Sequence, residues 1–285
     1  MFSCIALLGM LAYSCKPEAT DDGKDKDNQE QNNNGDNGNG EEQQPVDKSL
    51  IKIDGDFADW EALPEGYVKT FASNPESKRQ TIAEASFFAD ESCLYIKFTL
   101  NSNPDSLDAA HHDYAIHVYL DADNDPFTGG YAGQPYEFAD SCDFAKDHAM
   151  GAEIQLEQTI WKGTKVPDPF LPTLHQWDQQ YPFDSDSDDT DIQKKHGGWR
   201  AWTEIPALFT IGESAWDKDS RTMEIQVYFS SLALADDLPA ETIRAGFSIE
   251  RDWKPVGAIP NGPVTETDIY GRAQLAVVPR YLPEE

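Results

Sequence analysis

The chain has 285 residues, with 52 Asp or Glu against 22 Lys or Arg, so its formal net charge at pH 7 is −30. Such a negative surface repels phosphate backbones, which excludes nucleic acid as an expected partner. Residues 16–50 hold 4 Lys and 10 acidic residues, which leaves −24 for residues 51–285. Divalent cations and neutral glycans are the partners that this charge favours, unless the charge serves solubility alone.

Residues 1–15 have the pattern of a bacterial lipoprotein signal region. Residues 2–11 form an apolar run that is shorter than the roughly 20 residues needed to span a bilayer and is typical of the core of a secretory signal. Leu-Ala-Tyr-Ser leads up to Cys15, and this resembles, with Tyr13 as an unusual occupant, the signals after which lipoproteins are acylated. We expect Cys15 to be lipidated, so that acyl chains alone attach the protein to a membrane. An ordinary cleaved signal peptide is the alternative.

The next segment, residues 16–50, predicts a disordered acidic linker. Between Lys16 and Lys48 there is no aromatic residue and a single Val, and residues 31–40 consist of Gln, Asn, Gly and Asp. Such a segment buries too little apolar surface to offset the entropy lost on ordering. The predicted organisation is therefore a signal region 1–15, a linker 16–50 and one folded domain, residues 51–285.

The folded part has the pattern of many short strands. Residues 82–89 and 93–100 flank Asp-Glu-Ser at 90–92, which predicts a hairpin. Further β-rich runs lie at 114–120, 151–160, 223–229, 244–250 and 271–278, with one helical turn at 230–238 and loops at 167–172, 182–191 and 255–263. This pattern predicts an all-β fold: a single large antiparallel β-sandwich, immunoglobulin-like or jelly-roll-like, with little helix.

Three motifs, in chain order, carry a resemblance to a known superfamily. They are IKIDGDFADW at 51–60, VYLDADNDPFTGGY at 118–131 and GAEIQLE at 151–157. The series resembles the sandwich superfamily that includes family-9 carbohydrate-binding modules and DOMON-like domains. Together with the signal region and a late Arg-Asp-Trp at 251–253, it resembles exported lipoproteins of Bacteroidetes. The resemblance implies display at the outer membrane or cell surface, a glycan as ligand, and a core position for Trp60.

The second motif contains a candidate metal site. Asp121, Asp123 and Asp125 alternate in the loop after a predicted strand, and carboxylate oxygens at this spacing suit calcium. An EF-hand is excluded because Pro126 and Ala132 stand where that loop needs Gly and Glu. A site therefore has to recruit a distant carboxylate, and the family motif implies Glu153. The expected cofactor is a structural calcium ion; turn formation by the same aspartates is the alternative.

Aromatic residues near loops are candidates for holding a sugar, because pyranose rings stack on flat side chains. Five tryptophans lie in or near loop-rich stretches: Trp161, Trp177, Trp199, Trp202 and Trp253. Packing beneath the loops is the alternative for each of them. Cys93 and Cys142 remain as an even pair in an oxidising compartment, where they either form a disulfide or stay apart.

No catalytic signature stands out. The sequence lacks G-x-S-x-G, a Gly-rich phosphate loop and H-E-x-x-H, and it marks no carboxylate pair of the kind that glycosidases need. We therefore expect a non-catalytic surface lipoprotein whose sandwich binds carbohydrate. The alternative is a protein-interaction or scaffold subunit of a cell-envelope complex, without a sugar site.

Overall fold

The computed structural model describes residues 49–77, 80–125, 128–129, 151–178, 198–201, 210–261 and 275–283. Internal contacts divide the chain into Met1–Asp47 and Lys48–Glu285, and the second unit contains every described residue. The predicted signal region with Cys15 and almost all of the predicted linker lie outside the described residues, so both stay predictions. Within the described ranges, no helix is long and apolar enough to cross a membrane.

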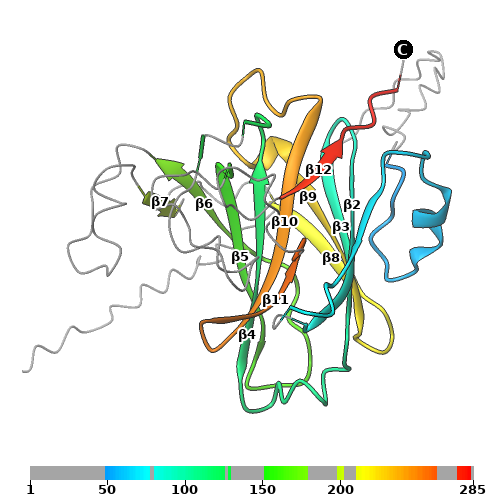
Figure 1. The fold of residues 1–285 in the computed structure, drawn as a ribbon, viewed down its shortest axis with the longest axis vertical. Coiled ribbons are helices and arrows are strands. Elements are labelled where there is room, and N and C mark those ends of the chain that lie inside the picture. Colours follow the sequence, from blue (N-terminus) through cyan, green and yellow to red (C-terminus); the bar gives the residue numbers. More distant parts are fainter. Residues whose placement is uncertain are drawn as a thin grey trace, which may run out of the picture. The chain divides into compact units, whose positions relative to one another are not determined.

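The described strands form two antiparallel sheets, which confirms the predicted all-β sandwich (Figure 1). The five-stranded sheet has the order β1-β2-β3-β9-β8, with β1 Lys69–Ala72, β2 Ile82–Ala89, β3 Cys93–Leu100, β9 Thr222–Tyr228 and β8 Gly212–Trp216. The seven-stranded sheet has the order β11-β10-β4-β5-β6-β7, with β12 also on β10. Its strands are β4 Asp113–Asp121, β5 Ile154–Lys162, β6 Thr173–Asp178, β7 Gly198–Ala201, β10 Thr242–Arg251, β11 Lys254–Ile259 and β12 Ala276–Pro279.

The main core lies between the two sheets. Alternate residues of a strand point to one face, and in both sheets the inward positions are apolar. Phe98 of β3 stacks on Phe247 of β10, with ring centroids 4.4 Å apart. Each large apolar side chain buried in this way stabilises the fold by about 1.5–3 kcal/mol, so the packing of the two inner faces holds the sheets together.

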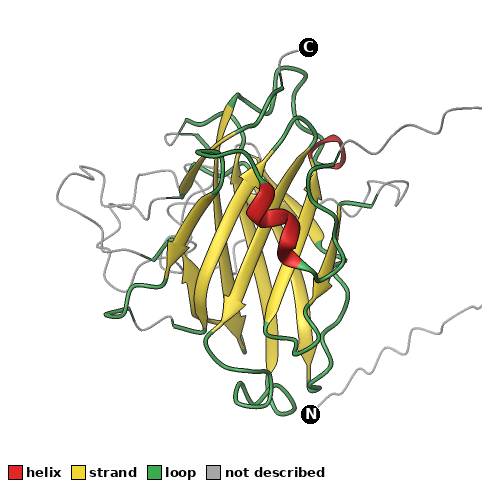
Figure 2. Cartoon of the chain, turned by 90° about the vertical axis from the view of Figure 1, so that its right-hand side faces the viewer, coloured by secondary structure: helices red, strands yellow, loops and turns green. Residues whose placement is uncertain are grey.

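A segment at the start of the domain covers the outer face of the five-stranded sheet. The 3-10 helix η1, Phe57–Ala62, begins after Asp56, whose carboxylate accepts the main-chain N–H of Ala58. In Figure 2 this helix lies across the strands. Trp60 is buried there in a second, smaller core with Ile51, Phe88 and Tyr95. The expected core position of Trp60 is therefore confirmed.

Glu224 of β9 anchors this segment to the sheet. Its Oε1 accepts the main-chain N–H groups of Asp54, at 2.8 Å, and Gly55, at 2.7 Å. Its Oε2 accepts the indole N–H of Trp60 at 3.1 Å. Burial raises the pKa of Glu224, and these donors oppose that rise by stabilising the charged form. Asp54, Gly55 and Trp60 of the first motif therefore all donate hydrogen bonds to one buried carboxylate, that of Glu224.

The strand predictions were accurate where both faces of a strand are covered. The predicted hairpin matches β2 and β3 at both bounds. The predicted loop at 255–263 was wrong at its start, because residues 254–259 form β11. β11 stands at the end of the sheet order, and its Pro255 lies beside the shift of register at Ile249/Glu250. Proline is tolerated at such an edge or bulge because it has no N–H to donate.

The helical turn was predicted only in part, and four short strands were missed. Of the helical turn predicted at 230–238, the structure has only the 3-10 helix η2, Phe229–Ser231, followed by turns. Strands β1, β6, β7 and β8 were not predicted. Each of them has six residues or fewer, and strands this short lack the long apolar alternation by which strands are found in a sequence.

Candidate functional site

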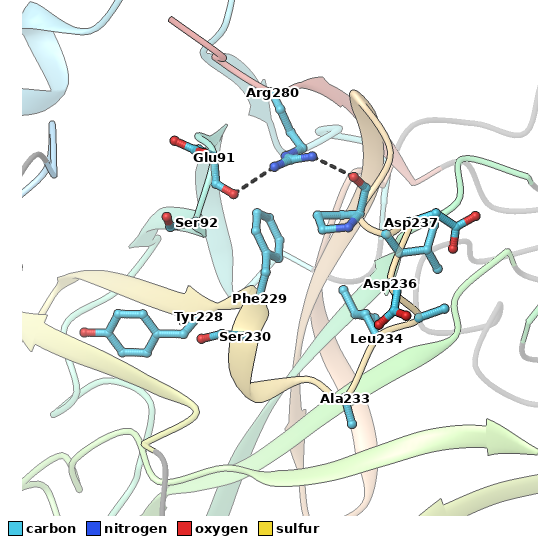
Figure 3. Close-up of a pocket in the computed structure, with 13 residues that line it drawn as sticks. Glu91, Ser92, Tyr228, Phe229, Ser230, Ala233, Leu234, Asp236, Asp237 and Arg280 are labelled. Carbon is cyan, nitrogen blue, oxygen red and sulfur yellow. Dashed lines mark hydrogen bonds between the residues drawn. The ribbon is translucent and has the colours of Figure 1, made fainter. Parts of the chain in front are cut away.

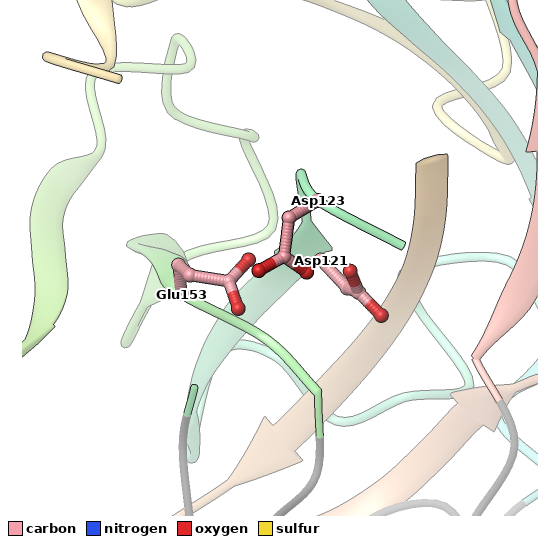
Figure 4. A group of neighbouring side chains, drawn as sticks. All are labelled: Asp121, Asp123 and Glu153. Atoms are coloured by element: carbon pink, nitrogen blue, oxygen red, sulfur yellow. The ribbon is translucent and has the colours of Figure 1, made fainter. Parts of the chain in front are cut away.

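Three carboxylates meet where β4 ends and β5 begins. Asp121 is the last residue of β4, and Glu153 directly precedes β5. The main-chain N–H of Glu153 donates to the carbonyl of Leu120 at 3.1 Å, so the antiparallel pairing brings the two acids to one level. Asp123 comes from the following turn. One oxygen from each of these three side chains lies within 4.8 Å of the others (Figure 4).

The turn after β4 is built around Glu153. The main-chain N–H of Ala122 donates to Glu153 Oε2 at 2.9 Å. The Thr128 hydroxyl lies 3.0 Å from Glu153 Oε1 and 3.1 Å from Asp123 Oδ2. Gly129 follows with φ of +68°, and a Cβ there would stand 2.4 Å from the carbonyl oxygen of Ala152 and 2.8 Å from Glu153 Oε1. The Thr-Gly pair of the second motif therefore shapes the carboxylate group.

The three acids carry more negative charge than their surroundings offset. Burial, and then the neighbouring Glu153, raise the pKa of Asp121 to about 8. Burial raises the pKa of Glu153 to about 7, with Asp123 adding to the rise. Arg244 Nη1 donates to Asp121 Oδ2 at 3.2 Å, while Asp121 Oδ1 is buried and has no hydrogen-bond partner in the described part of the chain. Buried charge of one sign is costly unless it is paired or coordinates a metal, and this group could hold a metal ion.

Asp125, the fourth predicted ligand, does not join this group. Its main-chain N–H donates to Asp123 Oδ1 at 2.7 Å, and its carbonyl accepts from the Thr128 hydroxyl at 2.9 Å. Asp125 thus contributes its backbone to the turn and lies outside the group of three carboxylates, so its carboxylate as a ligand stays a prediction. Asp123 combines the two roles weighed for these aspartates, since one of its oxygens accepts within the turn and its carboxylate belongs to the triad.

The predicted sugar platform at Trp161 is wrong. Its side chain is fully buried in the core between the sheets. The register of β4 with β5 shifts between Tyr114, which pairs with Trp161, and Ala115, which pairs with Thr159. Ile160 is the extra residue of this irregularity, so Ile160 and Trp161 both face the core although they are neighbours.

Two other predicted tryptophans lie on the seven-stranded sheet at opposite ends along the direction of its strands. Trp177 of β6 is half-buried, and its main-chain N–H donates to the carbonyl of Glu153 at 2.8 Å, which puts it beside the triad. Trp253 lies in the turn between β10 and β11 and is 84% exposed. The pairing of β10 with β4 puts Arg244 opposite Asp121 and Arg251 opposite Tyr114, so Trp253 is remote from the triad.

The remaining predicted residues are only partly described. The register of β6 with β7 puts Trp199 opposite Trp177. Trp202 and Cys142 lie outside the described residues. Cys93 is buried on the outer face of the five-stranded sheet, where Gln226 Nε2 lies 3.2 Å from its sulfur. Pairing of Cys93 with Cys142 stays a prediction.

A group of side chains on the outer face of the seven-stranded sheet was not predicted. His117 of β4, Glu157 of β5 and His175 of β6 lie close together, with Tyr119 beside His117. His117 and Glu157 stand at outward positions of two predicted strands, and this position was the signal by which the sequence could have indicated the two residues. His175 lies in a strand that the sequence pattern did not indicate, so the third member could not be placed.

The structure also has a pocket of about 580 Å³ beside the turn after η2. Arg280 is the cation among its lining residues (Figure 3). The guanidinium already donates to the carbonyls of Asp90, Glu91, Pro239 and Ala240. Because its donors are used in holding these loops together, Arg280 has little left to offer an anionic ligand, and Glu91, Asp236 and Asp237 make the rest of the lining acidic.

The fold and the acidic triad define an all-β sandwich with a carboxylate group that could hold a metal ion. Comparison of the chain with models of known protein families gives no match, and comparison with curated protein sequences also gives none.

Proposed function

We propose that the protein is a calcium-dependent, non-catalytic module that binds a glycan outside a membrane to which Cys15 tethers it. The observation that carries the proposal is the double role of Glu153. Its carboxylate belongs to the triad, and its carbonyl accepts the main-chain N–H of Trp177. A cation at the triad would therefore fix the end of β6 that carries Trp177, opposite Trp199 of β7.

The chemistry of the triad favours calcium over other ions. All three side chains offer carboxylate oxygens, which are hard ligands suited to calcium, magnesium or manganese and poorly suited to softer metals. Calcium accepts six to eight oxygens in flexible geometry, whereas magnesium demands a near-ideal octahedron. The irregular turn that supplies Asp123 and Thr128 supports the more flexible coordination.

The glycan part rests on the resemblance of the three motifs and on the position of the two tryptophans. Trp177 and Trp199 stand at paired positions of β6 and β7. The ring of Trp177, half-buried beside the triad, would supply part of the apolar platform that a sugar ring needs. Trp253 is exposed at the far end of the sheet and is therefore the matched control.

Binding of the full chain to a broad panel of polysaccharides tests this proposal, first with calcium and then with a chelator. We expect binding to at least one glycan, its loss under the chelator, and its loss in Trp177→Ala but not in Trp253→Ala. Circular dichroism of each variant establishes that it is folded. A folded chain that binds no glycan in the presence of calcium would overturn the proposal and favour a protein partner in the cell envelope.

A further inference from the structure

We propose that copies of this chain associate head to tail, with Trp253 of one copy seated in the pocket beside Arg280 of the next. The two surfaces lie at opposite ends of β10. The main-chain N–H of Arg280 donates to the carbonyl of Glu241, directly before β10, and Trp253 follows the last residue of that strand by two positions. A strand of 10 residues spans about 33 Å, so one copy cannot close the contact on itself (Figure 1).

The turn that carries Trp253 is exposed and held in one conformation. Trp253 is 84% exposed, the highest value for a large apolar side chain in the described part of the chain. Asp252 and Trp253 have φ of +48° and +66°, which is costly for a bulky residue. The Asp252 carboxylate accepts the main-chain N–H of Asp113 at 3.2 Å and lies 2.5 Å from Nδ1 of His112. These contacts fix the backbone beneath the indole, which lowers the ordering cost of a contact made through it.

Basic side chains flank this indole in a chain that is otherwise strongly acidic. Arg251 and Lys254 pair with each other across the turn, and both are exposed. The turn therefore presents an apolar ring between two positive charges, although the whole chain carries a net charge of −30. Interfaces place charges of opposite sign against each other, so the surface that receives this turn should be apolar with acidic surroundings.

The pocket at the other end of β10 has this chemistry. Its apolar lining includes Phe229, which is buried, and Leu234, which is half-buried. Three exposed carboxylates surround it, with Glu91 on one side of the Phe229 ring and Asp236 and Asp237 on the other (Figure 3). A volume of about 580 Å³ lies in the range of cavities that hold small organic groups. The pocket therefore has room for one indole and carboxylates for the two cations beside it.

The overall charge and the placement of the two surfaces determine what kind of assembly forms. Two acidic chains repel each other at long range, but this repulsion is screened beyond about 8 Å at physiological salt, whereas charges in direct contact are screened less. The contact is small, so association should be weak and should depend on concentration. Each bound copy still has one free turn and one free pocket, so the assembly extends into a line instead of stopping at a dimer.

Sedimentation of the full chain in about 0.15 M salt tests the proposal, with Cys15→Ser in every sample so that no acyl chain promotes association. The average mass should rise above that of one chain as the concentration approaches about 1 mM. Trp253→Ala should weaken association by about tenfold or more, as loss of a central aromatic anchor does. Ala235→Arg, at an exposed position of the pocket lining, should do the same because it places a bulky cation where the indole and Lys254 would lie. Val166→Ala, at a side chain that is 70% exposed elsewhere, is the control and should change nothing.

Mixing the two variants distinguishes this contact from any other mode of association. Trp253→Ala keeps an intact pocket and Ala235→Arg keeps an intact turn, so one contact can form between them and the resulting pair cannot extend. Equal amounts of the two should therefore give a species with twice the mass of one chain and nothing larger, although each variant alone stays monomeric. Circular dichroism of each variant establishes that it is folded.

Three results would overturn the proposal. They are a chain that stays monomeric with Trp253 and Ala235 both in place, a mixture of the two variants that stays monomeric, and a loss in Val166→Ala as large as that in Trp253→Ala. The contact contains neither the acidic triad nor Trp177, so it requires neither calcium nor a glycan. Failure of the calcium or glycan experiments therefore leaves the sedimentation result unaffected.

Discussion

Replacing Glu224 should detach the N-terminal segment of the domain from the five-stranded sheet. Glu224 has no exposed surface, and its two oxygens accept three N–H groups from Asp54, Gly55 and Trp60. Glu224→Gln keeps the size of the side chain and one carbonyl oxygen for the two main-chain donors. Its amide NH₂, however, would face the indole N–H of Trp60, so two donors would meet in a buried space.

The magnitude follows from the hydrogen bonds lost. A hydrogen bond to a charged group contributes about 1.5–3 kcal/mol, and a buried donor left without an acceptor costs about 1–3 kcal/mol. Glu224→Gln loses the bond to Trp60 and weakens the other two, so we expect a loss of about 2–3 kcal/mol in the free energy of unfolding. Glu224→Ala removes all three acceptor contacts and leaves a cavity, so its loss should be about 4 kcal/mol or more.

Urea denaturation followed by circular dichroism measures these losses, and Trp60→Phe is the variant that isolates the third bond. With no indole donor present, the amide introduced by Glu224→Gln meets no opposing N–H, so this substitution should cost about 1–2 kcal/mol less in the Trp60→Phe background. Stability of Glu224→Gln within about 0.5 kcal/mol of the unaltered chain, the range of neutral surface changes, would refute the reasoning. An equal cost of the substitution in both backgrounds would refute the role assigned to Trp60.

Three further predictions concern single contacts. Gly55→Ala places a Cβ 2.4 Å from a main-chain oxygen at φ of +79°, whereas Gly66→Ala at φ of +88° meets nothing within 4 Å. In urea denaturation, the free energy of unfolding should fall by about 1 kcal/mol for Gly66→Ala and by clearly more for Gly55→Ala. Arg280→Ala should lower the free energy of unfolding by about 3 kcal/mol because four carbonyls lose their donor, and a cost below about 1 kcal/mol would contradict the role of Arg280 in holding these loops together. Calcium should raise the Tm of the unaltered chain and of Asp125→Asn but not that of Glu153→Gln, as measured by thermal unfolding with calcium and with chelator; an equal rise in Glu153→Gln would exclude the triad.

The parts of the fold that could be predicted are those in which local pattern and final environment agree. β2 and β3 are apolar along their inner face, which meets the other sheet, and Phe88 and Tyr95 extend the apolar pattern on the outer face, where they meet the segment around Trp60. Their composition therefore indicated strands whatever the partner. Short strands at the sheet edges, such as β8 and β11, depend on pairing with β9 and β10, and a single sequence does not specify such pairing.

The candidate site divides in the same way. Asp121 and Asp123 are two residues apart and Glu153 sits in a motif, so sequence spacing and resemblance could bring them together. Asp125 fits the same spacing and yet lies outside the group of three, and its main-chain N–H donates to Asp123. The grouping of His117 with His175 requires the register of three strands, and no local signal contains it.

The pairing of strands far apart in the chain has a consequence for how the protein is made. β3 lies against β9, where Gln226 meets Cys93 across 133 residues, and β4 lies against β10, where Arg244 meets Asp121 across 123 residues. At a synthesis rate of about 5–20 residues per second, β3 waits roughly 7–27 s for its neighbour. Until then the β2–β3 hairpin presents an open apolar edge, which is a hazard for aggregation. Because the pairing that closes the sandwich is non-local, its formation should also be slow compared with that of the local hairpin.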